Sequence, residues 1–124
     1  MGIVIGARTS IQDGAVLHCT SALRTEVGDD CVIGHLVHLE DCTIRSQALV
    51  GTGAIVLARC VVGADAVVAA GAVVIEDTDV PPGALAMGVP ARIRLGAAPA
   101  IREYAVQQYL DKQARYRRDL RLIG

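Results

Sequence analysis

The chain has 124 residues, a formal net charge of −1 and 52% hydrophobic residues, yet it contains no Trp and no Phe. This length suits one domain, and a charge near zero argues against a nucleic acid as the main partner. No segment reaches the roughly 18–20 unbroken apolar residues of a membrane helix, and no signal peptide is visible, so the sequence predicts a cytoplasmic protein with no membrane partner.

A period of six residues dominates the chain from residue 3 to residue 80. A β-branched residue or leucine recurs about every sixth position, usually with a small residue two positions before it. The recurring residues are Ile5, Ile11, Leu17, Val27, Ile33, Leu39, Ile44, Val50, Val56, Val62, Val68, Val74 and Val80. A period of six matches neither a helix nor a strand meander, and it is typical of a parallel β-helix. Three hexads make one coil of about 18 residues, so we expect about four coils with these side chains stacked inside.

The cysteines follow the same period. Cys31, Cys42 and Cys60 stand at the small inward position of a hexad. There a free cysteine behaves as a small hydrophobe, so we expect interior thiols rather than disulfides or metal ligands. Cys19 lies off the period, beside His18.

Two steps of the series are irregular. Ten residues separate Leu17 from Val27, and we expect about four extra residues to bulge out within Cys19–Glu26. Five residues separate Leu39 from Ile44. Insertions in repeat proteins map to loops on one face, often the binding face, and every histidine of the chain lies in or beside this stretch.

The repeats end near two consecutive prolines. Pro81 and Pro82 cannot donate to a strand ladder, so we expect the coil to stop after Val80 and the segment 86–92 to close the last turn. From Pro99 to about residue 120 the apolar residues follow a helical spacing. The sequence therefore predicts a β-helix over residues 1–96 and a C-terminal helix over residues 97–124, packed on the coil or on a neighbouring subunit.

The period also places the polar residues. His18 follows the inward Leu17, and Glu40 follows the inward Leu39, 22 residues later. That distance is one coil plus the four inserted residues, so both side chains should lie on one corner about 5 Å apart, close enough to share a metal. His35 belongs to another corner and would reach them only in a trimer, while His38 should face outward on a strand. The alternative is that these side chains are merely exposed and solvated.

Two segments resemble γ-class carbonic anhydrases. Residues 5–18 read IGARTSIQDGAVLH and resemble that family's IGxxTNIQDGxVxH. Gly34-His35 together with Cys42-Thr43-Ile44 resembles its GHxxxxHGCTI segment. Residues 87–92 look like its closing GxPAK turn, which hexapeptide acyltransferases share.

The resemblance implies a left-handed parallel β-helix that forms a homotrimer. It implies a metal, zinc with iron or cobalt as alternatives, at the subunit interfaces, and reversible hydration of CO2 to bicarbonate by a zinc-bound hydroxide. His18 corresponds to the first ligand and His35 to the ligand from the neighbouring subunit. Gln12 would hydrogen-bond near the bound water, and Asp13 would pair with an interface arginine.

The chain departs from the family pattern in two places. Glu40 stands where the family has its third histidine. Two histidines and one glutamate form a sound zinc site, but the added negative charge makes the metal a weaker acid. His38 is out of register and could substitute only after a backbone shift. The family also carries one or two further coils upstream, which supply the arginine partner of Asp13.

Four functions stay open at this point. The first is CO2 hydration, with Glu26 or His38 as proton shuttle, and the second is a zinc-assisted thioesterase that uses the same chemistry on a carbonyl. The third is a hexapeptide acyltransferase, in which a histidine acts as general base and no zinc is needed. The fourth is a non-catalytic trimeric scaffold.

Overall fold

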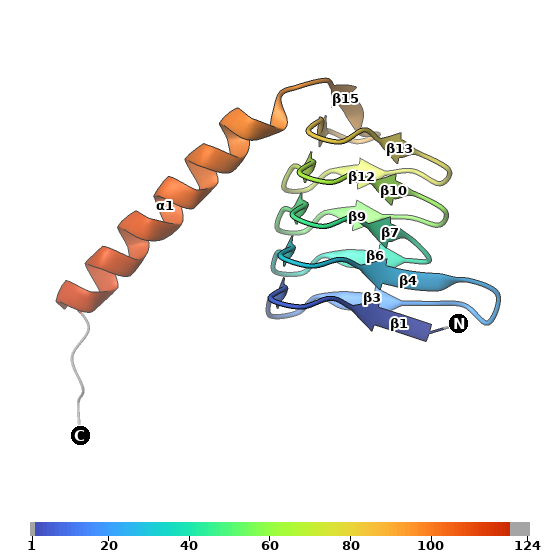
Figure 1. Cartoon of the computed structure of the whole chain (residues 1–124), viewed down its shortest axis with the longest axis horizontal. Helices are drawn as coiled ribbons and strands as arrows, with labels where there is room; N and C mark the ends of the chain where they lie inside the picture. The colour runs from blue at the N-terminus through green and yellow to red at the C-terminus, as the bar shows by residue number, and fades with distance from the viewer. Residues whose placement is uncertain (1, 120–124) are drawn as a thin grey trace.

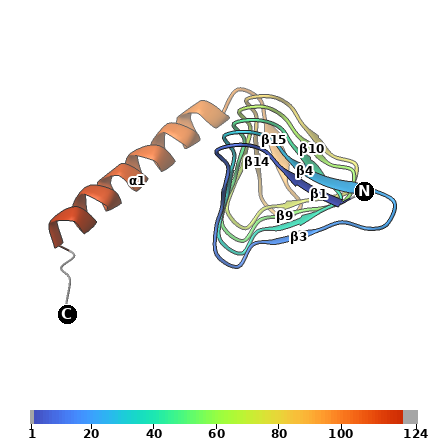
Figure 2. The same ribbon diagram turned by 60° about the horizontal axis from the view of Figure 1, so that its bottom comes forward.

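Stacked coils of short parallel strands form most of the molecule, and one helix leaves the last coil (Figure 1). The computed structural model describes residues 2–119, without the side chains of residues 105–110 and 113. Each complete coil gives one strand to each of three sheets, and the stack has a roughly triangular outline (Figure 2). The predicted parallel β-helix is confirmed.

The three sheets form the sides of the prism. The first contains β1 (Gly2–Ile5), β4 (Arg24–Val27), β7 (Thr43–Ile44), β10 (Val61–Val62) and β13 (Asp79–Val80). The second contains β2 (Ser10–Ile11), β5 (Val32–Ile33), β8 (Leu49–Val50), β11 (Val67–Val68), β14 (Leu85–Met87) and β15 (Arg92–Arg94). The third contains β3 (Val16–His18), β6 (His38–Glu40), β9 (Ile55–Val56) and β12 (Val73–Val74). All pairs are parallel except β14 with the closing strand β15.

Four coils are complete, and a fifth begins with β13 and β14. The expectation that the coil stops after Val80 is therefore wrong, because β14 still pairs with β11 in parallel. Pro81 and Pro82 lie in the turn between β13 and β14. Residues in this turn do not pair in a strand ladder, so the missing N–H groups of the prolines break no ladder hydrogen bond. The prolines thus form a corner of the prism rather than its end.

The recurring residues line the inside of the prism. From Val27 to Val80 each of them is at most 2% exposed, and small residues fill the space between them. The first coil has a neighbouring coil on one side only. Its inward residues keep the register, Ile5 with Val27 and Ile11 with Ile33, but they remain 47% and 37% exposed.

Three of the four cysteines are interior, as predicted. Cys31, Cys42 and Cys60 are buried and free, while Cys19 is half-buried. Burial raises the pKa of all three interior thiols, that of Cys42 to about 12. These thiols stay protonated at neutral pH and act as packing residues.

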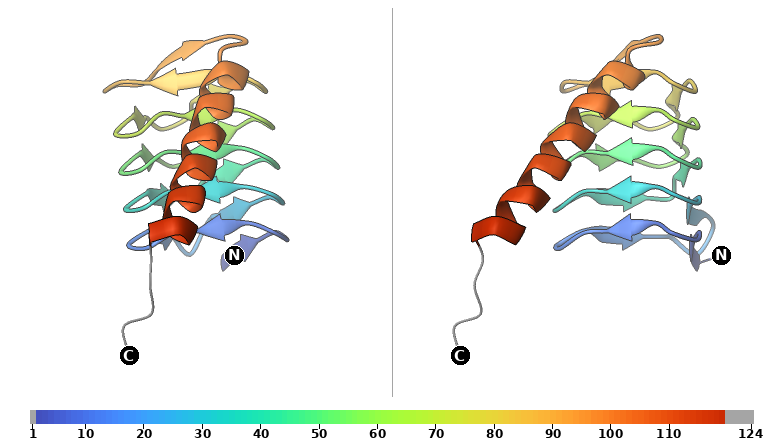
Figure 3. Two further views of the ribbon diagram at one scale, coloured as in Figure 1. Left: turned by 90° about the vertical axis from the view of Figure 1, so that its left-hand side faces the viewer. Right: turned by 60° about the vertical axis from the view of Figure 1, so that its left-hand side comes forward.

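Among the described residues, the helix α1 (Ala98–Asp119) contacts the prism in its first turns, through Ala98 and through Arg102, whose Nη1 lies 3.7 Å from Oδ1 of Asp65. Ala98 is buried against Val67 and Leu85 on the second sheet. Beyond this contact the helix diverges from the stack (Figure 3), and Ile101 and Tyr104 are exposed. The side chains of residues 105–110 lie outside the described residues, so a packed helix face stays a prediction. Within the described part of the chain, no helix combines the length and apolar content needed to cross a membrane.

Candidate functional site

Both irregular steps of the sequence fall on the corner between the third and first sheets. In the first coil this corner carries the inserted loop 19–23, and in the second coil Asp41 makes the turn with φ +47°. The backbone N–H of Asp41 donates to the carbonyl of His18, so the short turn lies directly above the end of β3. We had expected the loop to include Glu26, but it ends earlier. The strand β4 begins at Arg24, and Thr25 already points inward.

Three residues that the sequence analysis missed hold this loop in place. The backbone N–H of Thr20 donates to Oδ1 of Asp41 at 2.8 Å, and the Thr25 hydroxyl donates to the His18 carbonyl at 2.5 Å. Asp41 is only 5% exposed, and it is one of two buried polar residues found in the described part of the chain. The sequence did contain a sign of this contact, because Asp41 lies in the shortened step between Leu39 and Ile44.

His18 and Glu40 lie side by side, as the register predicted. They are Cα partners in the parallel pair β3–β6, each one residue beyond an inward leucine, so both side chains point outward. His18 is exposed and Glu40 is half-buried. His38 faces outward on the same strand as Glu40, and its Nε2 lies 3.7 Å from Oε1 of Glu40. Glu40 therefore has two histidine neighbours on the outer face, His18 on the paired strand β3 and His38 on its own strand.

The other predicted residues meet at the corner between the second and third sheets. Gln12 and Asp13 follow β2, and His35 follows β5 one coil later. The carbonyl of Asp13 accepts from the backbone N–H of Leu36, which stacks the two turns. Asp13 and His35 are exposed, and Gln12 is half-buried. The candidate residues thus form two groups on two corners.

A single chain does not unite these two groups. His35 lies in the turn before β6, and Glu40 is the last residue of that strand, so they stand at opposite edges of the third sheet. Among residues 2–119, no group of three or more His, Cys, Asp and Glu side chains could hold a metal ion. The pair His18 and Glu40 offers two donors of the types that zinc binds, and a closed site needs more from outside the chain.

Glu26 does not suit the role of proton shuttle that the sequence analysis gave it. It lies in β4, where it pairs with Val4 and Thr43 on the first sheet, instead of in the inserted loop. His18 and Glu40 are on the third sheet. His38 lies on the same sheet, with its Nε2 3.7 Å from Oε1 of Glu40.

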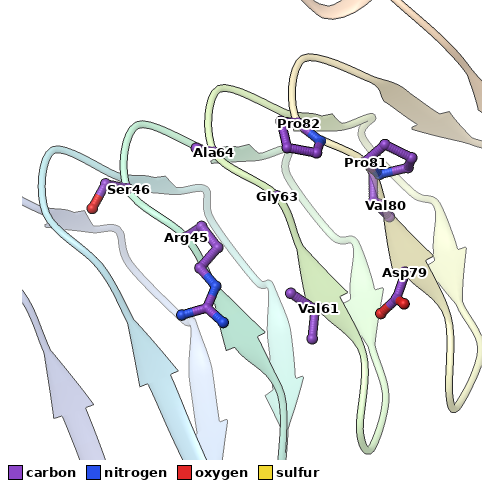
Figure 4. A pocket seen from close by; sticks show the side chains of 9 residues that line it. All are labelled: Arg45, Ser46, Val61, Gly63, Ala64, Asp79, Val80, Pro81 and Pro82. Carbon is purple, nitrogen blue, oxygen red and sulfur yellow. The ribbon is translucent and has the colours of Figure 1, made fainter.

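An open groove lies on the outside of the first sheet and its corner with the second (Figure 4). Its lining residues are Arg45, Ser46, Val61, Gly63, Ala64, Asp79, Val80, Pro81 and Pro82. Arg45 and Asp79 are its charged residues, and none of the three histidines borders it. The groove is therefore separate from both groups of candidate residues.

The chain is similar to curated carbonic anhydrases. It is 48% identical over 91 residues to the "Probable carbonic anhydrase" of Methanocaldococcus jannaschii, which covers 73% of this chain and 57% of that protein. It is 40% identical over 58 residues to the mitochondrial gamma carbonic anhydrase 3 of Arabidopsis thaliana, covering 42% of this chain and 22% of that protein. The chain thus spans less than two thirds of the length of these relatives.

Solved structures share the fold over most of the chain. A hexapeptide transferase family protein from Anaplasma phagocytophilum superposes with a TM-score of 0.71 at 30% identity, over 90% of this chain and 68% of that one. A scan against models of protein families matches none.

Proposed function

Because the chain belongs to the γ-carbonic anhydrase-like family of hexapeptide-repeat proteins, we propose that it hydrates CO2 reversibly as a zinc-dependent homotrimer. One observation carries the proposal: His18 and Glu40 are paired across β3 and β6 with both side chains outward. His18 and Glu40 of one subunit and His35 of the next would bind the metal. A cytoplasmic location belongs to the same proposal.

The donor set fits zinc. Imidazole nitrogen and carboxylate oxygen are common zinc ligands, and a set of two histidines and one glutamate leaves a fourth position open. His18 and His35 are exposed in the single chain, so neither must leave a packed core to reach a metal. When bound, zinc would lower the pKa of a coordinated water toward neutrality and provide the nucleophile for CO2.

The chain's own residues would orient the reactants. Gln12 stands on the corner of the second and third sheets, one coil before Gly34, the residue that precedes His35. Its side-chain amide can donate to an oxygen atom held at the site. Asp13 is exposed one turn below His35, where it can pair with an arginine of another subunit.

His38 can take part in proton export. It is half-buried on the outer face of β6, and its Nε2 is 3.7 Å from Glu40. Histidine is the side chain that most often transfers protons in catalytic sites, which suits it to this role. Of the two candidate shuttles, Glu26 and His38, the proposal therefore keeps His38.

Zinc binding in mixed trimers tests the shared site. The variants His18→Ala and His35→Ala should each bind less than a tenth of the zinc of the wild-type chain, because each removes a direct ligand from every interface. In trimers refolded from an equal mixture, some interfaces are complete. In these, the subunit that supplies His18 and Glu40 is the H35A variant, and the subunit that supplies His35 is the H18A variant. Random assembly gives this arrangement in about one interface in four, so about a quarter of the zinc and of the CO2 hydration should return.

The matched control mixes His18→Ala with Glu40→Ala. Both variants damage the same half of the site, so no interface in the mixed trimer is complete and neither zinc nor activity should return. Equal recovery in the two mixtures would contradict the division of ligands between subunits. Zinc is measured by elemental analysis of the trimer fraction, and CO2 hydration by stopped-flow with a pH indicator.

A hexapeptide acyltransferase is the second candidate, because the structure of the transferase family protein shares this fold and the first sheet carries an open groove. That function needs no metal. A wild-type chain without zinc that binds a CoA thioester in the groove would favour it over CO2 hydration. Zinc without CO2 turnover would favour a thioesterase if thioesters are cleaved, and the scaffold if they are not.

A further inference from the structure

The corner between the second and third sheets is built from glycines with one exception. Its turns place Gly14, Leu36, Gly53 and Gly71 in the left-handed region, with φ between +60° and +77°. Backbone bonds from Leu36 to Asp13 and from Gly53 to His35 show that these residues form one column along the stack. Glycine adopts this conformation without strain, whereas a bulky side chain does so at a cost.

Leu36 is unusual in both conformation and exposure. The other described non-glycine residues with positive φ are Arg8, Asp30, Asp41, Gln47, Arg59, Asp65 and Asp77, all of them polar. Leu36 has φ +60° and is 66% exposed, so burial in its own chain does not offset the strain. Its side chain leans over Gly14, since a Cβ added to Gly14 would lie 2.6 Å from Cδ2 of Leu36. An exposed, strained side chain of this kind indicates a role outside the chain's own core.

The third sheet offers an apolar surface beside the candidate ligands. One residue beyond each inward position, its outer face carries His18, Glu40, Leu57 and Ile75 in successive coils. Ile75 is 53% exposed and Leu57 is half-buried. The two metal-binding candidates therefore continue into two aliphatic side chains along the stack.

We infer that Leu36 is a positioning residue of the shared site, packing against the outer face of the second copy's third sheet beside His18 and Glu40. The inference rests on the proposed function. Leu36 directly follows His35, so an interface that brings His35 to the partner's His18 and Glu40 also brings Leu36 there. Its side chain then keeps water from one wall of the site and fixes the turn from which His35 reaches the metal.

Replacement by glycine separates this role from ordinary packing. Leu36→Gly restores the residue type of the column and removes the left-handed strain, so the metal-free monomer should unfold at the same temperature as the wild-type monomer or higher. Its zinc affinity should nevertheless fall about tenfold, the size of effect seen when groups that support a metal ligand are removed. Self-association measured by sedimentation in EDTA should weaken in parallel. Leu36→Met keeps the apolar bulk and should retain zinc affinity within about twofold.

Gln47→Gly is the matched control. Gln47 has φ +65° in the corner between the first and second sheets, so the substitution gives the same backbone relief. It should leave zinc affinity and self-association unchanged. The probes are zinc competition against a chromophoric chelator, sedimentation in EDTA and thermal unfolding in EDTA.

Three results would overturn the inference. A wild-type chain that binds zinc with an affinity that L36G leaves unchanged would overturn the role of Leu36 and leave the proposed function standing. So would an L36G variant whose metal-free monomer is less stable than the wild-type monomer, because Leu36 would then serve its own chain by packing on Gly14. A wild-type chain that binds no zinc and stays monomeric would overturn the proposed function, and this inference with it.

Discussion

Residues 2–41 and residues 42–87 are built from the same hexads, but they differ in the step between paired strands and in the burial of the inward side chains of the first coil. In the second region successive strands pair at steps of 18 residues, as in Ile44 with Val62 and Val62 with Val80, and every inward side chain is buried. In the first region the step is 22 residues, as in Leu17 with Leu39, and the inward side chains of the first coil are partly exposed.

The difference shows which departures from a repeat have functional meaning. The regular region holds most of the buried core and one groove without histidine, while His18, His35 and His38 all lie in the irregular region. The insertion and the shortened turn stack on one corner, at the end of the strands that carry His18 and Glu40. The candidate site residues therefore lie in the first two coils, toward the less buried end of the prism.

Truncating one inward isoleucine in each region should give the largest contrast. Ile44→Ala removes a side chain that is 1% exposed and leaves a cavity, so we expect the free energy of unfolding to fall by about 2–5 kcal/mol. Ile11→Ala makes the same chemical change where the side chain is 37% exposed, and it should cost about 1 kcal/mol or less. Urea unfolding of both variants measures the difference. Equal losses would mean that the end of the first coil is covered in solution.

The anchor of the inserted loop should give the next largest effect. Asp41→Ala removes the acceptor of the Thr20 N–H, and we expect it to lose about 1–2 kcal/mol of the free energy of unfolding. Asp77→Ala is the control, since Asp77 makes the equivalent left-handed turn with an exposed carboxylate. Hydrogen exchange at Thr20 should rise in D41A and stay unchanged in D77A. A loss as large in D77A would assign the effect to the backbone turn instead of the loop anchor.

The fold could be predicted from the sequence because the period of six determines which side chains point inward. The same period placed His18 beside Glu40 and put Cys31, Cys42 and Cys60 in the interior, and the structure confirms each position. The fifth coil was missed because proline was read as a strand breaker, whereas Pro81 and Pro82 occupy a corner.

The details of the site could not be predicted in the same way, because they depend on contacts that the period does not encode. The bond from Thr20 to Asp41 joins residues 21 positions apart, and it forms because one coil has an insertion and the next a deletion. The left-handed conformation of Leu36 is likewise visible only against the glycines of neighbouring coils.

Restoring a histidine at the third ligand position tests the chemistry of the irregular region. Glu40→His removes one negative charge from the proposed donor set, so the bound metal should become a stronger acid and CO2 hydration at neutral pH should rise about tenfold. Val61→His is the control, since it adds a histidine on the first sheet, in the groove that none of the three histidines borders. It should leave the rate unchanged. A slower E40H enzyme would indicate that the carboxylate itself assists the reaction.

The smallest expected effect concerns two matching ion pairs, one in each region. Arg59 and Asp77 form a two-point contact at 2.7 and 3.1 Å, and Arg8 and Asp30 form one at 2.8 and 3.0 Å. Hydrogen bonds from the arginines lower the pKa of both carboxyl groups below 3.8. A lowered pKa in the folded state adds stability above the unfolded value, and this stability is lost as the pH falls through the folded value.

The variants Asp77→Asn and Asp30→Asn should therefore each lower the Tm at pH 7, by less than about 2 °C because both pairs are exposed. The difference from wild type should shrink as the pH falls below about 3.8, and it should also shrink in about 1 M salt, which screens exposed charges. Thermal unfolding across this pH range measures both. If the difference from wild type grew in acid, the carboxylates would not be the groups that the arginines stabilise. Equal changes in Tm for the two variants would show that this ion pair stabilises a corner of the irregular region as much as a corner of the regular region. The two regions would then differ in the strands and turns that carry the histidines, and not in these ion pairs.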